Sequence, residues 1–464
     1  MKRSLVLLAL AAAAAAVSAP GQSVFTPGVR PFVTVDAPVI ALEHVRVIDG
    51  TGAEPLEDRT IVIENGRIRS IGGEIPANAR RLDLSGRSVI PGLVGMHEHL
   101  FYPSFDRIPL YIGQGFSFPR LYLASGVTTA RTAGTLEPQT DLNLKRMIDS
   151  GLMPGPKMLI TVGYLEGKGS FTPQMAELNG PEDARRFVEF WAAQGAHSFK
   201  AYMHITRAEL SAAIVTAHER GLKVTGHLCS VGFREAAALG IDNLEHGIIV
   251  DTEFEPSKKP DVCPDADFRR IDVGSTPVKE MIDDLVAHHV AVTSTLAVFE
   301  SAPPLERRFL DALSPDAARL YLAGRAMIRP EGLAVSAARV TKELEFERAF
   351  VKAGGLLTAG CDPTGNGSAL AGFGDQRNLE LLVKGGFTPL EAIRIATLNG
   401  AKFLGLDDHI GSISPGKQAD LVVIGGNPAA NISDVKKVEL VFKDGVGYDP
   451  VKLLESVRGQ VGLH

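Results

Sequence analysis

Two histidines, His97 and His99, stand one residue apart where an apolar run ends, and this spacing points to metal chemistry. Side chains alternate between the two faces of a strand, so residues i and i+2 point the same way. Both imidazoles can therefore reach one point at the end of the strand. Neutral imidazoles that converge on one point are typical ligands of a transition-metal ion. The spacing therefore predicts the beginning of a metal site.

Other polar residues also stand where apolar runs end, and these are Lys200, His227, His246 and Asp362. In a (β/α)₈ barrel the carboxyl ends of all strands meet at one face, so distant residues can share one site. Imidazoles and a carboxylate bind divalent cations well, and Zn²⁺ is the default expectation. An ammonium group would repel such cations. Carboxylation of the lysine by CO₂ would give an anionic ligand that could bridge two ions, which would share a hydroxide of lowered pKa.

The elements that must position these residues alternate between short apolar strands and helical patterns over residues 91–404, as in parallel α/β proteins. Strands are expected at 156–162, 195–202, 222–227, 241–246, 290–295 and 356–360. This pattern predicts an α/β fold with a (β/α)₈ TIM barrel, and a doubly wound open sheet is the alternative. The polar region 251–345 is expected to form loops and helices over the mouth or the back of the barrel.

The two ends of the chain have a different residue pattern from the segment 91–404. Residues 38–90 and 405–464 hold short β-branched runs separated by turns such as Asn65-Gly66 and Asp444-Gly445. We expect both segments to pair into one small β-sandwich domain, with the barrel inserted between them. A chain of 464 residues is long enough for a large and a smaller domain.

The composition is ordinary for a globular protein, with 45% hydrophobic and 22% charged residues and a formal net charge of −6. No basic tract stands out, so nucleic acid is not expected as a partner. Residues 1–22 begin with Lys2 and Arg3, continue with an apolar run and end in small residues, which is typical of a secretory signal. This predicts an exported protein, periplasmic or secreted, whose mature form has no membrane span; a retained membrane anchor is the alternative.

The chain has three cysteines: Cys229, Cys263 and Cys361. Three in a chain of this length are too few for a disulfide framework. An exported protein could bridge two of them, but we expect three buried or free thiols.

The order His-x-His, Lys, His, His, Asp resembles the amidohydrolase superfamily of binuclear metal-dependent hydrolases. Four flanking segments are also similar to that superfamily: 89–93, 126–129, 396–401 and 411–421. The resemblance covers nearly all of the chain after residue 22. Lys200 followed by Tyr202 is most similar to a branch of prolidase-like metallopeptidases and mycotoxin-cleaving amidases.

The resemblance implies a ligand set for two divalent ions, most simply Zn²⁺: His97, His99, Lys200, His227, His246 and Asp362. It places the His97–His99 pair with Asp362 on the more buried ion and the other two histidines on the more exposed one, with the carboxylated lysine as the bridge. It also implies that Asp362 takes a proton from the shared hydroxide as this attacks a carbonyl group. The same carboxyl then passes the proton to the leaving amine.

Residues beyond the ligands are expected to contact the substrate. Tyr202 is two residues past Lys200 and should face the same cavity, where its hydroxyl could donate to the developing oxyanion. His204 could do likewise or bind substrate. Further substrate contacts are expected from Arg131, Tyr164 and Gln376. Relatives often carry other residues around these three positions, so the substrate cannot be carried over from them.

We therefore expect an exported metal-dependent amidohydrolase that cleaves the amide C–N bond of a small molecule, such as a dipeptide or an N-acyl amino acid. The alternatives are a lactonase or esterase, or a cyclic amidine hydrolase of the same superfamily. Deaminases of that superfamily typically use one metal ion and lack the bridging lysine, so Lys200 argues against them. A non-catalytic scaffold would be expected to lose metal ligands. Many relatives assemble, so a homo-oligomer is expected.

Overall fold

The computed structural model describes residues 25–105, 109–364 and 369–463. The predicted secretory signal, residues 1–22, lies outside the described residues. None of the helices within those three ranges has the length and apolar content that crossing a bilayer requires.

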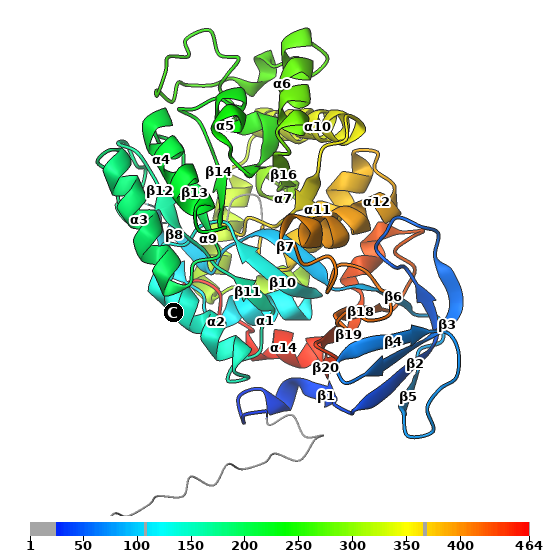
Figure 1. Ribbon diagram of the computed structural model, residues 1–464. Helices are drawn as coiled ribbons and strands as arrows, with labels where there is room; N and C mark the ends of the chain where they lie inside the picture. Colours follow the sequence, from blue (N-terminus) through cyan, green and yellow to red (C-terminus); the bar gives the residue numbers. More distant parts are fainter. Residues whose placement is uncertain (1–24, 106–108, 365–368, 464) are drawn as a thin grey trace, which may run out of the picture.

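Parallel strands alternating with helices build the larger part of the molecule (Figure 1). The strands are β7 (Leu93–Glu98), β10 (Val127–Thr132), β11 (Lys157–Leu159), β12 (Thr161–Leu165), β13 (Ser198–Ala201), β14 (Lys223–Gly226), β15 (Asn243–Glu245), β16 (Ala291–Ser294) and β17 (Leu357–Ala359). β7, β10 and β11 pair in one sheet, and β12 to β17 pair in chain order in a second. Only Ile160 separates β11 from β12, so one extended segment leads from the first sheet into the second.

The end of the last parallel strand lies beside the first. Asp362, just beyond β17, donates its backbone N–H to the carbonyl group of His97 in β7 over 2.8 Å. The strands thus follow one another in chain order, as in a TIM-barrel-type fold. A doubly wound sheet would instead place later strands on both sides of the first. The strand order therefore supports the TIM-barrel-type prediction over its alternative.

The helices carry local signals that begin and end them. α4 begins with a capping box, in which Thr206 and Glu209 each accept a backbone N–H from the other. α3 and α5 end at Gly195 and Gly240, which adopt the left-handed conformation that favours glycine. The helices are α1 (Ser117–Ala124), α2 (Pro138–Asp149), α3 (Pro181–Gln194), α4 (Arg207–His218), α5 (Phe233–Leu239), α6 (Thr276–Ala287), α7 (Leu296–Phe299), α8 (Arg307–Ala312), α9 (Pro315–Ala326), α10 (Pro330–Lys352), α11 (Phe373–Lys384), α12 (Pro389–Arg394), α13 (Gly400–Phe403) and α14 (Pro450–Ser456).

Shorter helical turns and one hairpin complete this part of the molecule. The turns are η1 (Arg30–Phe32), η2 (Gly247–Val250), η3 (Phe268–Arg270), η4 (Ile395–Asn399) and η5 (Ile432–Lys436), and the hairpin pairs β8 (Phe101–Phe105) with β9 (Pro109–Gly113). The polar region 251–345 holds loops, the strand β16 and the helices from η3 to the greater part of α10, and loops and helices are what the sequence predicted there.

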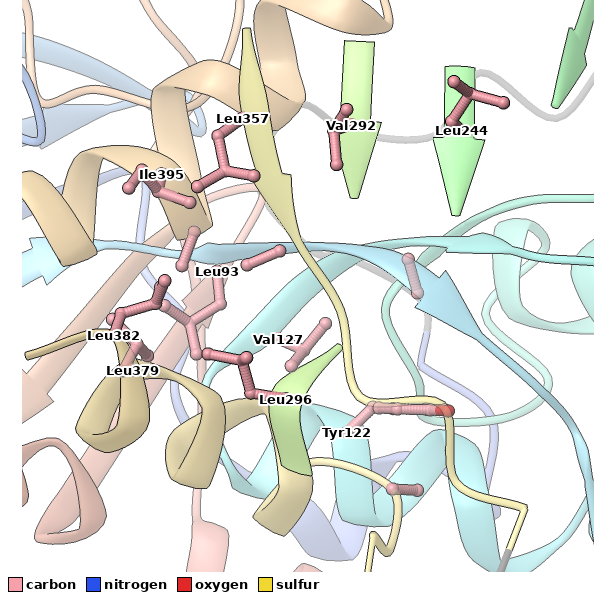
Figure 2. Packing of buried hydrophobic residues seen from close by; sticks show 14 of the residues in the cluster. Leu93, Tyr122, Val127, Leu244, Val292, Leu296, Leu357, Leu379, Leu382 and Ile395 are labelled. Carbon is pink, nitrogen blue, oxygen red and sulfur yellow. The ribbon is translucent and has the colours of Figure 1, made fainter. Parts of the chain in front are cut away.

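The interior between strands and helices is apolar. Figure 2 shows side chains from the parallel strands packed against side chains from α7 and α11. The labelled residues, each at most 4% exposed, are Leu93, Tyr122, Val127, Leu244, Val292, Leu296, Leu357, Leu379, Leu382 and Ile395. Full burial of one such aliphatic side chain stabilises a protein by about 1.5–3 kcal/mol. This packing fixes the strands whose ends carry the polar residues of interest.

Strands from both ends of the chain pair in one nine-stranded mixed sheet. In Figure 1 the blue strands of the N-terminal segment lie beside the orange and red strands of the C-terminal segment. The strands are β1 (Val33–Val35), β2 (Val39–Val47), β3 (Leu56–Glu64), β4 (Arg67–Ile71), β5 (Arg80–Asp83), β6 (Ser88–Pro91), β18 (Leu421–Ile424), β19 (Val438–Lys443) and β20 (Val446–Tyr448). β18 lies between β6 and β19 and joins the two segments.

The turns of this sheet follow the sequence signals. Asn65-Gly66 joins β3 to β4 with φ angles of 50° and 77°, and Asp444-Gly445 joins β19 to β20 with 53° and 77°. Positive φ at both central residues is what a tight type I′ hairpin turn requires. The strand β2 is irregular in its middle, where His44 has a φ of 59° and the register with β3 shifts.

Gly92 alone separates the terminal sheet from the first parallel strand. β6 ends at Pro91 and pairs with β18, whereas β7 begins at Leu93 and pairs with β10. A side chain at position 92 would collide with Thr128, because a Cβ built there lies 2.0 Å from the Thr128 hydroxyl oxygen. The chain therefore changes partner sheets at a glycine, five residues before His97.

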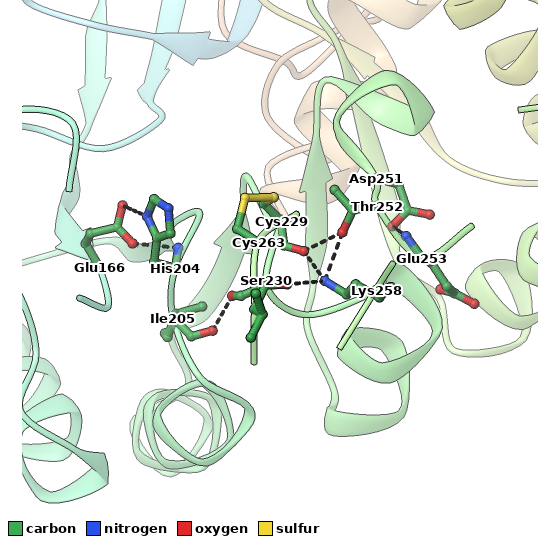
Figure 3. The surroundings of a disulfide bond; sticks show 11 residues. Glu166, His204, Ile205, Cys229, Ser230, Asp251, Thr252, Glu253, Lys258 and Cys263 are labelled. Atoms are coloured by element: carbon green, nitrogen blue, oxygen red, sulfur yellow. Dashed lines mark hydrogen bonds and ion pairs between the residues drawn. A yellow bond between two sulfur atoms is a disulfide. The ribbon is translucent and has the colours of Figure 1, made fainter. Parts of the chain in front are cut away.

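Cys229 and Cys263 form a disulfide bond, and only Cys361 is a free thiol (Figure 3). The expectation of three free thiols is therefore wrong for the first two, because the fold brings their Cα atoms to 4.9 Å across a separation of 34 residues. The carbonyl oxygen of Cys229 also accepts hydrogen bonds from Thr252 and Lys258. These contacts tie the 251–263 segment to the end of β14, two residues past His227.

Removal of this disulfide is expected to lower the free energy of unfolding by about 3–4 kcal/mol, because the bond closes a 34-residue loop in the unfolded chain. Guanidinium unfolding of the Cys229→Ala/Cys263→Ala variant beside the oxidised wild type measures the effect. A reducing agent should destabilise the wild type and leave the double variant unchanged. A loss below about 1 kcal/mol would contradict this role.

Candidate metal centre

Three residues from two distant strands form a compact group at the carboxyl ends of the parallel strands. His97 and His99 lie at the end of β7, and their Nε2 atoms are 3.6 and 3.3 Å from Oδ1 of Asp362. One ligand atom from each residue lies within 4.8 Å of the others, and all three residues are buried. Gly360 permits this approach, since a Cβ there would lie 2.3 Å from the backbone nitrogen of His97. The structure thus brings Asp362 to the two imidazoles that the His-x-His spacing had paired.

Hydrogen bonds on the far side of each ring orient these two imidazoles. Nδ1 of His97 lies 2.7 Å from Glu245 Oε2, and Nδ1 of His99 lies 3.1 Å from the carbonyl oxygen of Gly134. A carbonyl oxygen only accepts, so the His99 proton resides on Nδ1 and leaves a lone pair on Nε2. Outer hydrogen bonds of this kind fix the tautomer of metal-binding histidines. Both Nε2 atoms are thereby directed at the Asp362 carboxylate.

Two further histidines stand beside this group. The ring of His246 is centred 4.5 Å from that of His97 and 4.5 Å from that of His227. Nδ1 of His246 lies 2.7 Å from the hydroxyl of Thr295 and 3.8 Å from Asp362 Oδ2. His246 adopts a φ of 69°, which lets the chain leave β15 directly into η2. The four imidazoles therefore form one continuous row.

The protonation states suit metal binding. Burial lowers the pKa of His97 to about 4 and that of His227 to about 3, and it lowers the pKa of His246 well below its ordinary value. Burial alone would raise the pKa of Asp362, but the surrounding imidazoles outweigh it and hold that pKa well below its usual range. At neutral pH these three imidazoles are thus neutral and the carboxylate is ionised, which are the forms that ligate cations.

Lys200 completes the set at the third predicted position. It lies in β13, is 1% exposed, and its Nζ has no hydrogen-bond partner among the described residues. The carboxylate of Glu245 is 3.8 Å away. Burial, the largest effect, lowers the pKa of Lys200 to about 8. A buried ammonium group without hydrogen bonds is costly, so this environment favours a lysine that has lost its charge.

Glu245 and Arg131 support His97 from behind. The Arg131 guanidinium donates to Glu245 Oε1 over 2.7 Å and to the carbonyl oxygen of Met96, and Thr225 donates to the same Glu245 oxygen. Arg131 and Glu245 are at most 1% exposed, so neither faces solvent. Sequence analysis missed Glu245, although it directly precedes His246 at the end of a strand. Arg131 was predicted to contact substrate, and the structure places it behind the site instead.

Replacement of Glu245 by Gln is expected to weaken Zn²⁺ binding by roughly 10- to 100-fold, the usual effect of losing an outer carboxylate. A neutral amide orients His97 less firmly and leaves the Arg131 charge uncompensated. Competition with a chromophoric chelator measures the affinity. Glu57→Gln is the control, because that side chain is 63% exposed in the terminal sheet. Equal affinities in both variants would contradict the role given to Glu245.

The metal-binding candidates line a cavity of about 480 Å³. Its wall consists of His97, His99, Phe101, Tyr111, Ala133, Leu136, Tyr164, Phe171, Met175, Lys200, Tyr202, His227, His246, Val298, Phe299, Ser301, Arg339, Asp362 and Thr364. Tyr202 packs edge-on against His227, with ring centres 5.0 Å apart, and Tyr164 packs against Tyr202 at 4.9 Å. Both tyrosines thus lie where the sequence placed them, beside the imidazoles in an aromatic wall.

Two other predicted contacts lie outside this wall. His204 donates its backbone N–H to Glu166 Oε1 over 2.7 Å, and its ring also faces that carboxylate (Figure 3). Gln376 is fully buried, where it donates to the carbonyl oxygen of Ser125 and accepts from Arg308. The structure therefore brings neither residue to the cavity, in contrast to the expectation from the sequence. Arg339, which does line the cavity, was missed.

Comparisons with known proteins agree with this arrangement. The model of the "Amidohydrolase family" matches residues 88–447, a range that includes every candidate metal ligand. A prolidase-like protein from Bifidobacterium longum of known structure is 26% identical, covers 92% of this chain and 100% of its own, and superposes with a TM-score of 0.66. A Xaa-Pro dipeptidase structure with methionine bound in its active site is 22% identical over 89% of this chain and 100% of its own, with a TM-score of 0.67.

Among curated sequences, the imidazolonepropionase of Streptomyces avermitilis is 35% identical over 111 residues. That match covers 22% of this chain and 26% of the relative. The chain thus matches about a quarter of that relative's length, which is a local similarity.

Proposed function

Because the chain belongs to the amidohydrolase family, we propose that it is a metal-dependent hydrolase that cleaves the amide C–N bond of a small molecule, such as a dipeptide or an N-acyl amino acid. The observation that carries this proposal is the buried group of His97, His99 and Asp362 at the wall of a cavity. The likeness to a prolidase-like protein over nearly the full length of both chains supports the amide substrate.

The residues present fit divalent cations. His97, His99 and Asp362 would hold one ion and His227 with His246 a second, and Lys200 would bridge them once carboxylated. The buried Nζ of Lys200, which has no hydrogen-bond partner among the described residues, supports that modification, because a carboxylated lysine carries oxygen atoms that ions can satisfy. Ions held there would lower the pKa of a bound water and polarise a carbonyl oxygen.

Two side chains of the cavity, Asp362 and Tyr202, are proposed to transfer or donate protons during the reaction. Asp362 is ionised at neutral pH and faces the cavity, so it can accept a proton from the attacking water and return it to the leaving amine. Burial raises the pKa of Tyr202 well above its usual value, so its hydroxyl keeps its proton. We infer that this hydroxyl, in the wall of the same cavity, donates to the carbonyl oxygen as negative charge develops on it.

Export is part of the same proposal. The Cys229–Cys263 disulfide supports it, because such bonds persist in oxidising compartments and are rare in the cytosol.

A hydrolysis screen of metal-replete protein tests the activity, with dipeptides, N-acyl amino acids and lactones offered in parallel. We expect the amides to be cleaved and the lactones to react poorly, and a His97→Ala/His99→Ala variant to lose activity on every substrate. Cleavage of lactones alone would replace the proposal with a lactonase. No hydrolysis by protein that holds metal ions would overturn it altogether.

A further inference from the structure

Arg339 places a positive charge in the wall of the cavity, and no carboxylate of the described residues pairs with it. It projects from α10, and its guanidinium carbon lies 5.1 Å from the ring centre of Phe268 and 5.8 Å from that of Phe299. Within the described part of the chain, Arg339 has no ion pair and no hydrogen bond. Arg308 and Arg377, by contrast, pair with Glu306 and Glu300. Aromatic faces therefore hold this guanidinium in place while its N–H groups remain available.

Arg339 is also close to the metal-binding candidates. The Phe299 ring that it contacts is itself 5.7 Å from the ring of His246. The Phe299 ring thus lies close both to the guanidinium and to the row of imidazoles. Among the described wall residues the one carboxylate is Asp362, which is engaged by the histidines. The end of the cavity near Arg339 therefore offers a cation without a competing protein anion.

We propose that Arg339 binds the free carboxylate of the substrate, a deduction that rests on the proposed function. A planar guanidinium pairs with a carboxylate through two parallel N–H···O bonds, which sets orientation as well as affinity. The carboxylate would lie at Arg339, and the scissile carbonyl would lie at the imidazoles that line the same cavity. The substrate class is accordingly an N-acyl amino acid or dipeptide with a free terminal carboxylate.

The aromatic residues elsewhere in the cavity wall indicate which side chain that substrate carries. Phe101, Tyr111 and Phe171 form a chain of edge-on ring contacts, with centres 5.1 and 6.4 Å apart, that line the same cavity. Aromatic walls favour flat or bulky apolar groups. We therefore expect N-acyl phenylalanine and similar apolar amino acids to be preferred over charged ones.

A matched substrate pair tests the role of Arg339. N-acetyl-phenylalanine and its C-terminal primary amide differ in the carboxylate charge and share the scissile bond. Arg339→Gln should lower kcat/KM for the acid by roughly 10- to 100-fold, mainly through KM, because a hydrogen-bonded charge is lost. The same variant should change kcat/KM for the primary amide by less than about twofold. Arg339→Lys, which keeps the charge but not the planar fork, should fall between wild type and Arg339→Gln.

Arg307→Gln is the control, because it removes an equal charge from a side chain that is 91% exposed. Thermal melting shows whether each variant folds. Equal losses on acid and amide, or no loss on either, would overturn the assignment while leaving the proposed hydrolase intact.

A binding measurement separates this assignment from the proposed function. Calorimetry with metal-replete wild type and Arg339→Gln, titrated with N-acetyl-phenylalanine and with its amide, needs no turnover. If no amide bond is hydrolysed, the proposed function fails, and a preference for the acid that disappears in Arg339→Gln still supports the carboxylate site. Equal binding of acid and amide by the wild type would overturn that site.

Discussion

Asp362→Asn is expected to lower kcat for amide hydrolysis by roughly two to four orders of magnitude, the usual contribution of a general acid–base group. The Asp362 carboxylate lies 3.3 Å from His99 Nε2 and 3.6 Å from His97 Nε2 and opens onto the cavity. An amide of the same shape keeps an oxygen ligand but cannot accept and return a proton. Steady-state kinetics on the best substrate of the screen measures the loss.

Metal content separates the two roles of Asp362. If the Asn variant retains the metal ions of the wild type and loses turnover, the loss belongs to proton transfer. Asp316→Asn is the control, because that side chain is 75% exposed on α9. Wild-type turnover in Asp362→Asn would remove this residue from the mechanism.

Lys200→Met is expected to reduce bound metal from about two equivalents to about one, and kcat by roughly 10²- to 10³-fold, since one cation supplies several kcal/mol of charge stabilisation. Methionine has a similar volume and suits a site that is 1% exposed, so the fold should survive. Elemental analysis of purified protein measures the metal.

Isotope labelling tests the carboxylation itself. Wild type reconstituted with metal and ¹³C-bicarbonate should acquire a label that Lys200→Met does not. Two equivalents of metal in the variant, or no label in the wild type, would show that Lys200 serves as an ordinary lysine.

The sequence predicted the site best where a residue ends a strand. His97, His227 and His246 each stand at or just past a strand terminus, and strand ends of a TIM-barrel-type fold share one face, so local pattern determined their position. The family prediction, which rested on the order of these residues, is confirmed by the match over residues 88–447. These candidate ligands could thus be named without knowledge of any tertiary contact.

The prediction of a side chain's location failed where that location depends on a contact with a residue distant in the sequence. Arg131 lies on a strand near the site, but its pairing with Glu245, 114 residues away, draws it behind His97. Tyr202 directly follows β13 and still donates its backbone N–H to Leu165 of the neighbouring strand, whereas His204 lies two residues further on and donates its backbone N–H to Glu166. The disulfide is a similar case, because its two cysteines meet only through the folding of the segment between them.

The role of Arg339 was missed for another reason. Its segment was expected to form loops and helices over the mouth or the back of the barrel, but its polar and charged composition did not indicate which face of a helix is buried. The 23-residue helix α10 nevertheless buries one stripe, including Val340, Leu344 and Phe350, against the body of the molecule. Arg339 borders that stripe and is therefore turned toward the cavity.

The single residue between β6 and β7 has a consequence for evolution. Because Gly92 is the whole connection, the position of β6 in the terminal sheet directly sets where β7, with His97 and His99 at its end, begins. Insertion of one residue there would reverse which face each histidine occupies. The terminal sheet therefore cannot be exchanged as an independent module, and lineages that alter it must preserve this junction or lose both imidazoles together.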